Sequence, residues 1–365
     1  MQKIMQQILE HDDKTTGNRP RFPQKLTWSA PCFVLVASLA YCGIVAAEAV
    51  ALLPAQRSIH YQNLYVRPLE DRILPAPLSV LQLAYRGNRR AGVDLWPIAA
   101  PADHPLVPLL RTMIRSLPAP IYRLATRHLA GIFLVDHTFG SARTEGVWDP
   151  SDRLVGGYMV LNVTALSRPA NAWISMRENS AFHSTSANTT IEVILESPET
   201  DTPESALRFI FLHELGHVLG MALGVHGHWA VPETFPLTLQ SPFARLSWRL
   251  DGRGGLVSPG KQMSPLLAQL HFYRFEAAPL PRSIALRVYR QMARTDFPSL
   301  YGALDAYEDF AETFALYVHT RILGKPYAVV VKEGGRTIGV YRSCLQIGAC
   351  PAKAAFVKRL LVNVQ

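Results

Sequence analysis

The chain has 365 residues, of which 48% are hydrophobic and 18% are charged. A chain of this length and composition can bury a sizeable core, which excludes a wholly disordered protein. The formal net charge is +9, but the lysines and arginines are scattered and form no run interleaved with aromatic residues. This scatter argues against a nucleic-acid-binding protein and favours a basic surface that tolerates anionic lipids or acidic substrates.

Residues 1–50 have the pattern of an export segment. No charged residue occurs between Leu26 and Ala47, basic residues precede this apolar stretch, and small residues follow it. This is the layout of a secretory signal cleaved after Ala47 or Ala49. The stretch is also long enough to span a bilayer, so an uncleaved membrane anchor and a buried hydrophobic helix are alternatives. We expect an exported protein, periplasmic or secreted, with membrane association through this segment if it stays uncleaved.

The first half of the remaining chain predicts helices followed by strands. Residues 51–104 are rich in proline and predict an extended segment that covers the fold. Apolar residues recur at helical spacing from Leu106 to Leu129 and are interrupted at Pro118 and Pro120, which predicts two helices. Three segments rich in β-formers follow, and we expect them to be neighbours in one sheet: Gly131–Asp136, Tyr158–Thr164 and Ile191–Glu196. The last alternates glutamates with apolar residues, as an edge strand with one solvated face does.

Two long helices are predicted in the second half. Thr202 and Pro203 provide the N-cap and the first residue of a helix that continues to Leu223. The other helix runs from about Asp305 to Arg321, and a β-hairpin is predicted over Tyr327–Tyr341. These elements predict an α+β fold.

The same pattern suggests a domain organisation. Residues 105–224 form a predicted catalytic lobe, and residues 301–365 form a mainly helical second lobe that ends in the hairpin. Residues 225–300 are irregular apart from an amphipathic helix near Ser283–Arg294. We interpret them as an insertion or a substrate-recognition segment between two halves of a site.

The segment His213-Glu-Leu-Gly-His217 carries the strongest chemical signal. Imidazoles four residues apart lie on one face of a helix, where both can reach the same cation. Glu214 projects beside them and can accept a proton from a water molecule. The match arises by chance in roughly 1–2% of chains of this composition. The alternative is a pair of core histidines whose polar groups are satisfied by neighbours. We predict a zinc site with Glu214 as the catalytic base.

A catalytic zinc site needs a third protein ligand and an open position. A longer motif with a third histidine would place that residue at position 223, where the chain has Leu223, so this source fails. His226 and His228 lie past the expected helix end and suit a role in a loop.

The second long helix offers the other source of a third ligand. Glu308 and Glu312 share one face of it, one turn apart. Glu308 can bind the metal, and Glu312 can accept the free N–H of a ligating imidazole. The alternative is that Asp305 and Glu308 form a capping box at the helix start, with Glu312 solvated.

Two segments, His213–His217 and the stretch around Glu308, resemble the gluzincin zinc metallopeptidases, most closely the type of catalytic domain found in anthrax lethal factor. The second segment reads Tyr301-Gly-Ala-Leu-Asp-Ala-Tyr-Glu308-Asp-Phe-Ala-Glu312-Thr-Phe. The resemblance implies a zincin-like domain with a small mixed sheet packed on the first helix, and Glu308 as the third ligand. It also implies that Tyr301 stabilises the tetrahedral oxyanion, whereas the residue pattern alone is equally compatible with a packing tyrosine. The long separation of the two segments means that substrate preference does not carry over.

The sequence thus predicts an exported zinc endopeptidase that acts on a peptide or protein, which we expect to bind alongside the strand at 191–196. One alternative is a catalytically silent zinc-binding envelope protein that recognises a protein partner. Another is a membrane-anchored regulatory protein with structural zinc, which would require a fourth ligand at a spacing that the sequence lacks.

The number and spacing of the cysteines are compatible with an exported protein. Only Cys344 and Cys350 follow the export segment. Their spacing can close a small disulfide loop that an oxidising compartment would preserve, and a pair of free thiols is the alternative.

Overall fold

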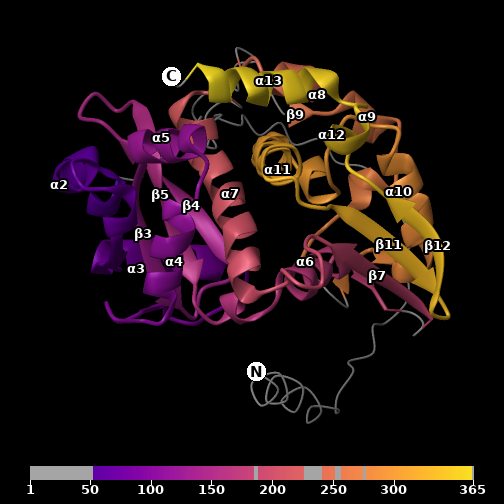
Figure 1. Cartoon of the computed structure of the whole chain (residues 1–365), viewed down its shortest axis with the longest axis horizontal. Coiled ribbons are helices and arrows are strands. Elements are labelled where there is room, and N and C mark those ends of the chain that lie inside the picture. Colours follow the sequence, from indigo (N-terminus) through magenta and orange to yellow (C-terminus); the bar gives the residue numbers. More distant parts are fainter. Residues whose placement is uncertain (1–51, 185–187, 226–240, 251–255, 274–276, 364–365) are drawn as a thin grey trace, which may run out of the picture. The chain divides into compact units, whose positions relative to one another are not determined.

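The computed structural model describes residues 52–184, 188–225, 241–250, 256–273 and 277–363 (Figure 1). The chain combines helices with several small sheets, which confirms the predicted α+β class. In this described part, no helix is both long and apolar enough to cross a bilayer. The predicted export segment, and the His226 and His228 pair assigned to a loop, lie outside the described residues.

The larger sheet has five strands. Their order is β1-β3-β5-β4, with β2 paired to β3, and the bounds are β1 Ile73–Pro75, β2 Ile98–Ala99, β3 Leu129–Asp136, β4 Ala142–Trp148 and β5 Leu154–Asn162. β1, β3 and β5 run parallel, while β2 and β4 are antiparallel to their partners. β3 is buried along nearly its whole length because helices cover both faces, as is usual for parallel strands. β4, which the sequence did not predict, forms one edge of this sheet.

Helix α3 (Leu78–Arg90) covers one face of the larger sheet. Its Val80 and Leu83 share an apolar cluster with Phe133 on β3. The prediction of an extended segment over 51–104 is therefore wrong for this helix. Pro77 immediately precedes the helix with an extended backbone, a position where proline does not interrupt helical hydrogen bonds.

The opposite face of the sheet is covered by α4 (Leu106–Arg115), α5 (Ala119–His128) and α7 (Pro203–Ala222). The first two confirm the pair of helices predicted on either side of Pro118. The hydroxyl of Thr202 accepts a hydrogen bond from the backbone N–H of Ser205 at 3.2 Å, which confirms the predicted start of α7.

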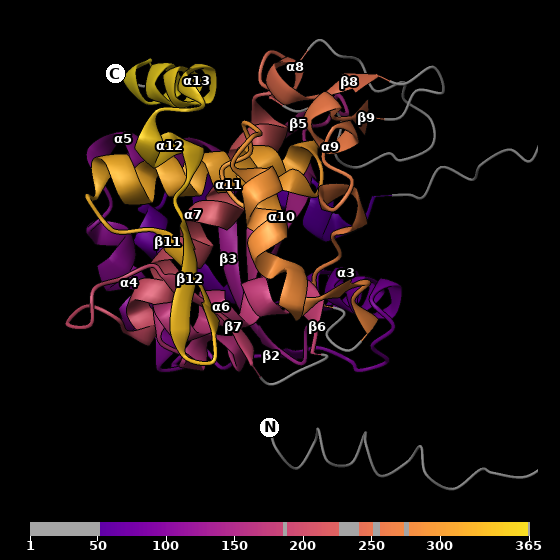
Figure 2. The ribbon, with the colours of Figure 1, turned by 90° about the vertical axis from the view of Figure 1, so that its right-hand side faces the viewer.

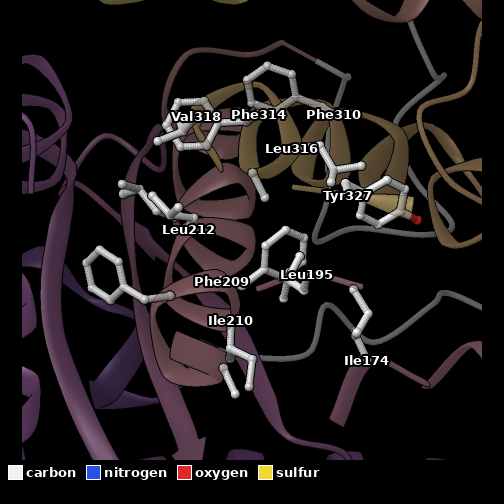
Figure 3. Packing of buried hydrophobic residues seen from close by; sticks show 14 of the residues in the cluster. Ile174, Leu195, Phe209, Ile210, Leu212, Phe310, Phe314, Leu316, Val318 and Tyr327 are labelled. Carbon is white, nitrogen blue, oxygen red and sulfur yellow. The ribbon is translucent and has the colours of Figure 1, made fainter. Parts of the chain in front are cut away.

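Helix α7 is buried on all sides, between the larger sheet and α11 (Ala306–Tyr317) (Figure 1). Most of its side chains are apolar, and the buried polar groups are concentrated at His213, Glu214 and His217. Figure 3 shows Phe209 and Leu212 of α7 in one cluster with Phe310 and Phe314 of α11. The two predicted halves of the site thus share a single core.

The second sheet has the order β12-β11-β7, all antiparallel. β11 (Ala328–Glu333) and β12 (Arg336–Tyr341) confirm the predicted hairpin, which turns at two glycines with positive φ. β7 (Thr189–Ile194) pairs with β11, so the prediction that all three early strands share a sheet is wrong for this one. Local sequence predicts that a strand forms, but its partner is chosen by contacts distant in the chain.

The prediction that the glutamates of this strand lie on a solvated face is correct for Glu192 and wrong for Glu196. Glu192 is exposed and pairs with Lys332, whereas Glu196 is 1% exposed and pairs with Lys325 at 2.8 Å. The strand ends before Glu196, so the alternation of the strand no longer determines where that side chain points.

The remaining elements are short and surround this core. They are α2 Gln62–Tyr65, α6 Ala170–Asn179, β6 Phe182–His183, α8 Ala244–Ser247, β8 Arg249–Leu250, β9 Leu256–Val257, α9 Pro259–Gln262, β10 Leu280–Pro281 and α10 Ala285–Met292. α10 confirms the helix predicted near Ser283–Arg294, and it packs on β12, where Leu286 approaches Gly339.

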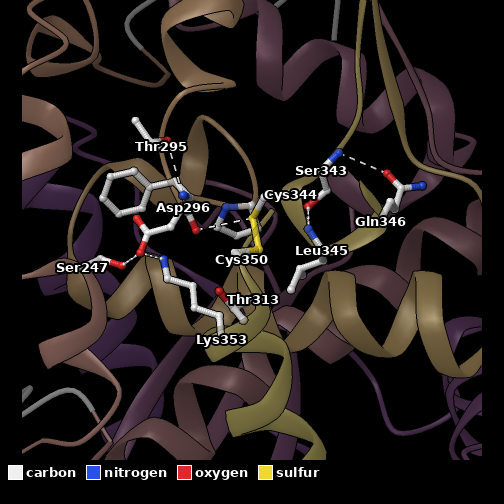
Figure 4. The surroundings of a disulfide bond; sticks show 12 residues. Ser247, Thr295, Asp296, Thr313, Ser343, Cys344, Leu345, Gln346, Cys350 and Lys353 are labelled. Carbon is white, nitrogen blue, oxygen red and sulfur yellow. Dashed lines mark hydrogen bonds and ion pairs between the residues drawn. A yellow bond between two sulfur atoms is a disulfide. The ribbon is translucent and has the colours of Figure 1, made fainter. Parts of the chain in front are cut away.

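The last helices are α12 (Cys344–Ile347) and α13 (Pro351–Val362), and α13 packs against α11 and crosses over it (Figures 1 and 2). A disulfide joins Cys344 to Cys350, so the paired alternative is correct (Figure 4). This bond ties the start of α12 to the N-cap of α13.

Lys353 of α13 forms a buried ion pair with Asp309 of α11. Its Nζ lies 2.6 and 2.8 Å from the two carboxylate oxygens, and both residues are at most 1% exposed. Trp248 Nε1 donates a further bond to the same carboxylate at 2.9 Å. Burial raises the pKa of Asp309 to about 6, against the positive charge of Lys353. The pair holds α13 on α11 next to Glu308.

Replacing Lys353 with Met should lower the free energy of unfolding by about 3–5 kcal/mol at neutral pH, because Asp309 keeps a buried and unpaired charge. Urea unfolding followed by circular dichroism measures this difference. Lys358→Met is the matched control: Lys358 lies on the same helix but is exposed, so its change should stay within about 0.5 kcal/mol. Equal losses in both variants would contradict the role of the buried pair.

Candidate metal centre

His213 and His217 project from one face of α7 toward α11. Their Nε2 atoms are 3.2 Å apart, and the residues are 7% and 4% exposed. Glu308, in the first turn of α11, places its Oε2 3.2 Å from Nε2 of His213 and 3.5 Å from Nε2 of His217. The structure therefore brings the three predicted ligands together, and this group can hold a metal ion.

A glycine within the motif allows the two helices to approach this closely. A Cβ atom on Gly216 would lie 2.7 Å from Cα of Ala311 in α11, which is far too close. Glycine weakens a helix interior, so its place here is explained by the contact with the facing backbone. Because Ala311 is also small, the short Glu308 side chain can reach both imidazoles.

The geometry of the three donors fits a tetrahedral zinc ion. Two atoms bound to such an ion at its usual bond lengths are about 3.3 Å apart. The three observed separations are 3.2, 3.2 and 3.5 Å. Oε2 of Glu308 is also buried and makes no hydrogen bond of good geometry within the described structure, although it lies between two imidazoles. An ion at this point would satisfy it.

The charges around the donors favour a cation. Burial disfavours the imidazolium form of His213, but Glu308 and Glu312 together raise the pKa of this imidazole to about 10. The facing imidazoles lower the pKa of Glu308 below its ordinary value, although burial opposes ionisation. The negative potential that retains a proton on His213 would equally attract a divalent ion.

Glu312 supports His213 from behind. Its Oε1 accepts a hydrogen bond from Nδ1 of His213 at 2.9 Å, so the other imidazole nitrogen faces Glu308. Arg177 of α6 binds both carboxylate oxygens at 2.8 and 3.1 Å, and the Ser299 hydroxyl donates to Oε2 at 2.6 Å. Arg177 and His213 lower the pKa of Glu312 to about 2 despite its burial.

The capping alternative for the second helix is half right. Asp305 is the N-cap of α11 and accepts hydrogen bonds from the backbone N–H groups of Tyr307 and Glu308, each at 2.9 Å. Glu312 is fully buried, however, so it is not a solvated surface residue. Both the cap and the metal donors therefore use the first turns of α11.

Glu214 is held by the edge strand of the larger sheet. It is 5% exposed, and its Oε2 accepts a hydrogen bond from the Thr144 hydroxyl of β4 at 2.6 Å. The same hydroxyl lies 3.2 Å from the backbone carbonyl of Glu214. This pair of contacts fixes the carboxylate beside the ligand His213.

A cleft of about 310 Å³ opens beside these groups. It is lined from α7 by Ile210, His213 and Glu214, from β4 and the turn before it by Phe139–Arg143, from α3 by Gly87 and Arg90, and otherwise by Trp173, Arg177, Tyr273 and Tyr301. Of the three candidate donors, His213 lines this cleft, and Glu214 lines it beside His213.

Tyr301 lies in this cleft. Its ring centroid is 5.7 Å from the ring of His213, and the Arg177 guanidinium stacks over it at 4.6 Å. Burial raises its pKa well above the ordinary value, so the hydroxyl keeps its proton. Tyr273 lines the same cleft with its ring 6.3 Å from that of Tyr301, and it has a φ of 60°, an uncommon backbone conformation for a bulky residue.

Sequence reasoning missed four residues of the site: Thr144, Arg177, Tyr273 and Ser299. Thr144 and Arg177 come from elements far along the chain from the residues that they bind, whereas Ser299 lies 13 residues before Glu312. Arg177 followed by Glu178 in α6 is the only local signal, and consecutive charges in a helix are ordinary on a protein surface. Nothing in the local sequence marks the other three.

Comparison with known proteins yields no relative: no protein-family model, no curated protein and no solved structure matches this chain. The gluzincin resemblance therefore depends on the site residues themselves.

Gly216→Ala should separate α7 from α11, because the new methyl group would collide with the backbone at Ala311. We expect weaker zinc binding in equilibrium dialysis and a loss of about 1–3 kcal/mol in unfolding free energy. Gly260→Ala serves as control, since a Cβ there would meet no atom closer than 3.5 Å. Wild-type zinc affinity in the Gly216 variant would show that this contact does not position Glu308.

Proposed function

We propose that this protein is an exported, zinc-dependent endopeptidase with a zincin-like fold of the gluzincin type. One observation carries the proposal: two imidazoles and a distant carboxylate meet at zinc-ligand spacing, with a second carboxylate beside them in an open cleft. Three protein donors leave one coordination position for water or substrate, as catalytic zinc sites do.

Zinc suits the donors better than magnesium or calcium, because two of the three are imidazole nitrogens. His213, His217 and Glu308 would hold it. When bound, zinc acts as a Lewis acid that acidifies water and polarises a carbonyl group. Glu312 keeps the Nδ1 proton of His213 engaged, which leaves Nε2 free to bind the ion.

Glu214 is the general base in this proposal. It adjoins a ligand, lines the cleft, and is oriented by Thr144 so that one oxygen stays free for a proton. A carboxylate in this position can take a proton from water and later pass it to the leaving amine. A protein that only bound zinc would not need it.

A peptide substrate can pair with the outer edge of β4 in the part before Trp148, where Arg57 forms an isolated bridge to the strand. This strand has a neighbour on one side in the sheet, and its first residues line the cleft. The strand at 191–196, which the sequence suggested for this purpose, belongs to the other sheet and does not line the cleft. Main-chain pairing would orient a peptide without requiring one sequence.

Tyr301 and Tyr273 are the candidate donors to the developing oxyanion. Both line the cleft together with His213 and Glu214. Burial raises the pKa of both, so each can donate a hydrogen bond at neutral pH.

Two features support export. The disulfide between Cys344 and Cys350 is of a kind that persists in oxidising compartments. The composition of residues 1–50 matches a signal or an anchor. Periplasmic or secreted placement remains part of the proposal.

The central experiment compares zinc content with peptide cleavage. Wild-type protein should contain one zinc per chain and cleave casein or a quenched-peptide library, and a chelator should stop cleavage. Glu308→Ala should lose zinc and activity together, whereas Glu214→Gln should keep zinc and lose activity. Glu204→Gln is the control, because Glu204 lies in the first turn of the same helix, is only partly buried and does not line the cleft.

The outcomes separate the alternatives. Stoichiometric zinc without cleavage of any substrate would favour the catalytically silent zinc-binding protein. Retained turnover in Glu214→Gln would remove this residue as the base. Zinc retained by Glu308→Ala would overturn the ligand assignment.

The tyrosines can be assigned by single substitutions. Tyr301→Phe should lower kcat about 100-fold with zinc retained and KM little changed, since it removes one oxyanion donor. Steady-state kinetics beside Tyr273→Phe shows which hydroxyl matters more. Tyr317→Phe, on α11 and outside the cleft lining, should behave as wild type. An unchanged kcat in both cleft variants would exclude a tyrosine donor.

A further inference from the structure

The cleft extends past the metal donors and across the edge of β4 to helix α3. On that side it is lined by Gly87 and Arg90 of α3 and by Arg143 of β4. None of these residues has a part in zinc binding or proton transfer. Arg90 and Arg143 together form a basic wall at one end of the cleft.

Alternation along β4 separates catalytic from basic groups. Thr144 points toward α7 and binds Glu214. Its neighbours Arg143 and Glu145 point to the opposite face, where their side chains pair at 2.6 Å. A peptide added to the same edge would also alternate, so every second side chain would face the basic wall.

The position of Arg143 is specified by the structure. Its Nη1 donates to the backbone carbonyl of Ala84 in α3 at 3.4 Å. A Cβ on Gly87 would lie 1.4 Å from the same nitrogen, so the guanidinium occupies the space that this helical glycine leaves open. A side chain packed in this way is held in place for a planar partner.

The charge at this wall is not balanced. Within the basic wall, Arg143 pairs with the carboxylate of Glu145, whereas Arg90 has no ion pair within the described residues, which leaves a surplus of one positive charge. Arg86 and Arg90 are exposed one turn apart on α3, and neither forms an ion pair within the described residues. A negatively charged group that enters the cleft would therefore meet Arg90 without a competing carboxylate, next to Arg143, which Glu145 already pairs.

We propose that the basic wall selects peptides that carry an aspartate or glutamate side chain facing α3, close to the cleaved bond. This inference rests on the proposed peptidase function and adds the substrate class. Arginine binds carboxylates through paired N–H donors, and a partly enclosed cleft strengthens such contacts.

The test measures both binding and cleavage. Zinc-loaded Glu214→Gln protein is titrated with three fluorescein-labelled random peptide pools, each with Glu, Gln or Lys at one central position, and binding is followed by polarisation. The Glu pool should bind about five- to tenfold more tightly than the Gln pool, and the Lys pool least tightly. Wild-type protein digests the same pools, and mass spectrometry of the products shows which residues flank the cleaved bonds.

Two charge reversals on α3 provide the matched comparison. Arg90→Glu should abolish the preference for the Glu pool and favour the Lys pool. Arg89→Glu changes the net charge equally, but Arg89 pairs with Asp94 and does not line the cleft, so the preference should persist. Equal effects of the two reversals would mean that overall charge alone acts, and the proposal would fail.

The two proposals fail in different ways. If no peptide is cleaved by wild-type protein but the Glu pool still binds preferentially, the peptidase function fails and the basic wall stands. If peptides are cleaved and bound without preference for Asp or Glu, the basic wall is overturned and the peptidase function stands.

Discussion

The site depends on the close packing of two helices. Helix α7 carries both imidazoles, and α11 carries Glu308. Their backbones can approach only because Gly216 faces Ala311. A larger residue at either position would move the carboxylate outward, and the three donor atoms would no longer lie within one coordination sphere. The mutual spacing of the donors is thus set by backbone contact.

A second layer of charges fixes the orientation of the donors. Glu312 links His213 to Arg177 and Ser299, so each buried charge has a partner. Burying such groups without partners would cost several kcal/mol each. On the far side of α11, Asp309 is neutralised by Lys353 from α13. The helix that supplies the third donor is therefore anchored on two faces by buried ion pairs.

The two sheets have different relations to the site. β4 of the larger sheet borders the cleft, orients Glu214 through Thr144, and leaves one edge without a neighbouring strand. β7, which the sequence favoured for this role, pairs with the C-terminal hairpin instead. Both are short edge strands, and their local patterns do not indicate which one lies near the metal donors. That choice follows from how the sheets pack on α7.

Several features depend on local spacing and could be predicted from the order of the residues alone. These are the helical register that places His213, His217 and Glu214 together, the cap at Thr202, the hairpin, and the choice of Glu308 over Leu223 as the third member of a group that could hold a metal ion. Other features became visible in the folded chain: the pairing of β7, the helix α3, and the contacts that bring Arg177, Ser299, Thr144 and Tyr273 to the site. Helical periodicity can be recognised in a short stretch of sequence because it depends on residues three and four apart. Contacts between distant segments depend on how the whole core packs, and a short sequence pattern does not contain that information.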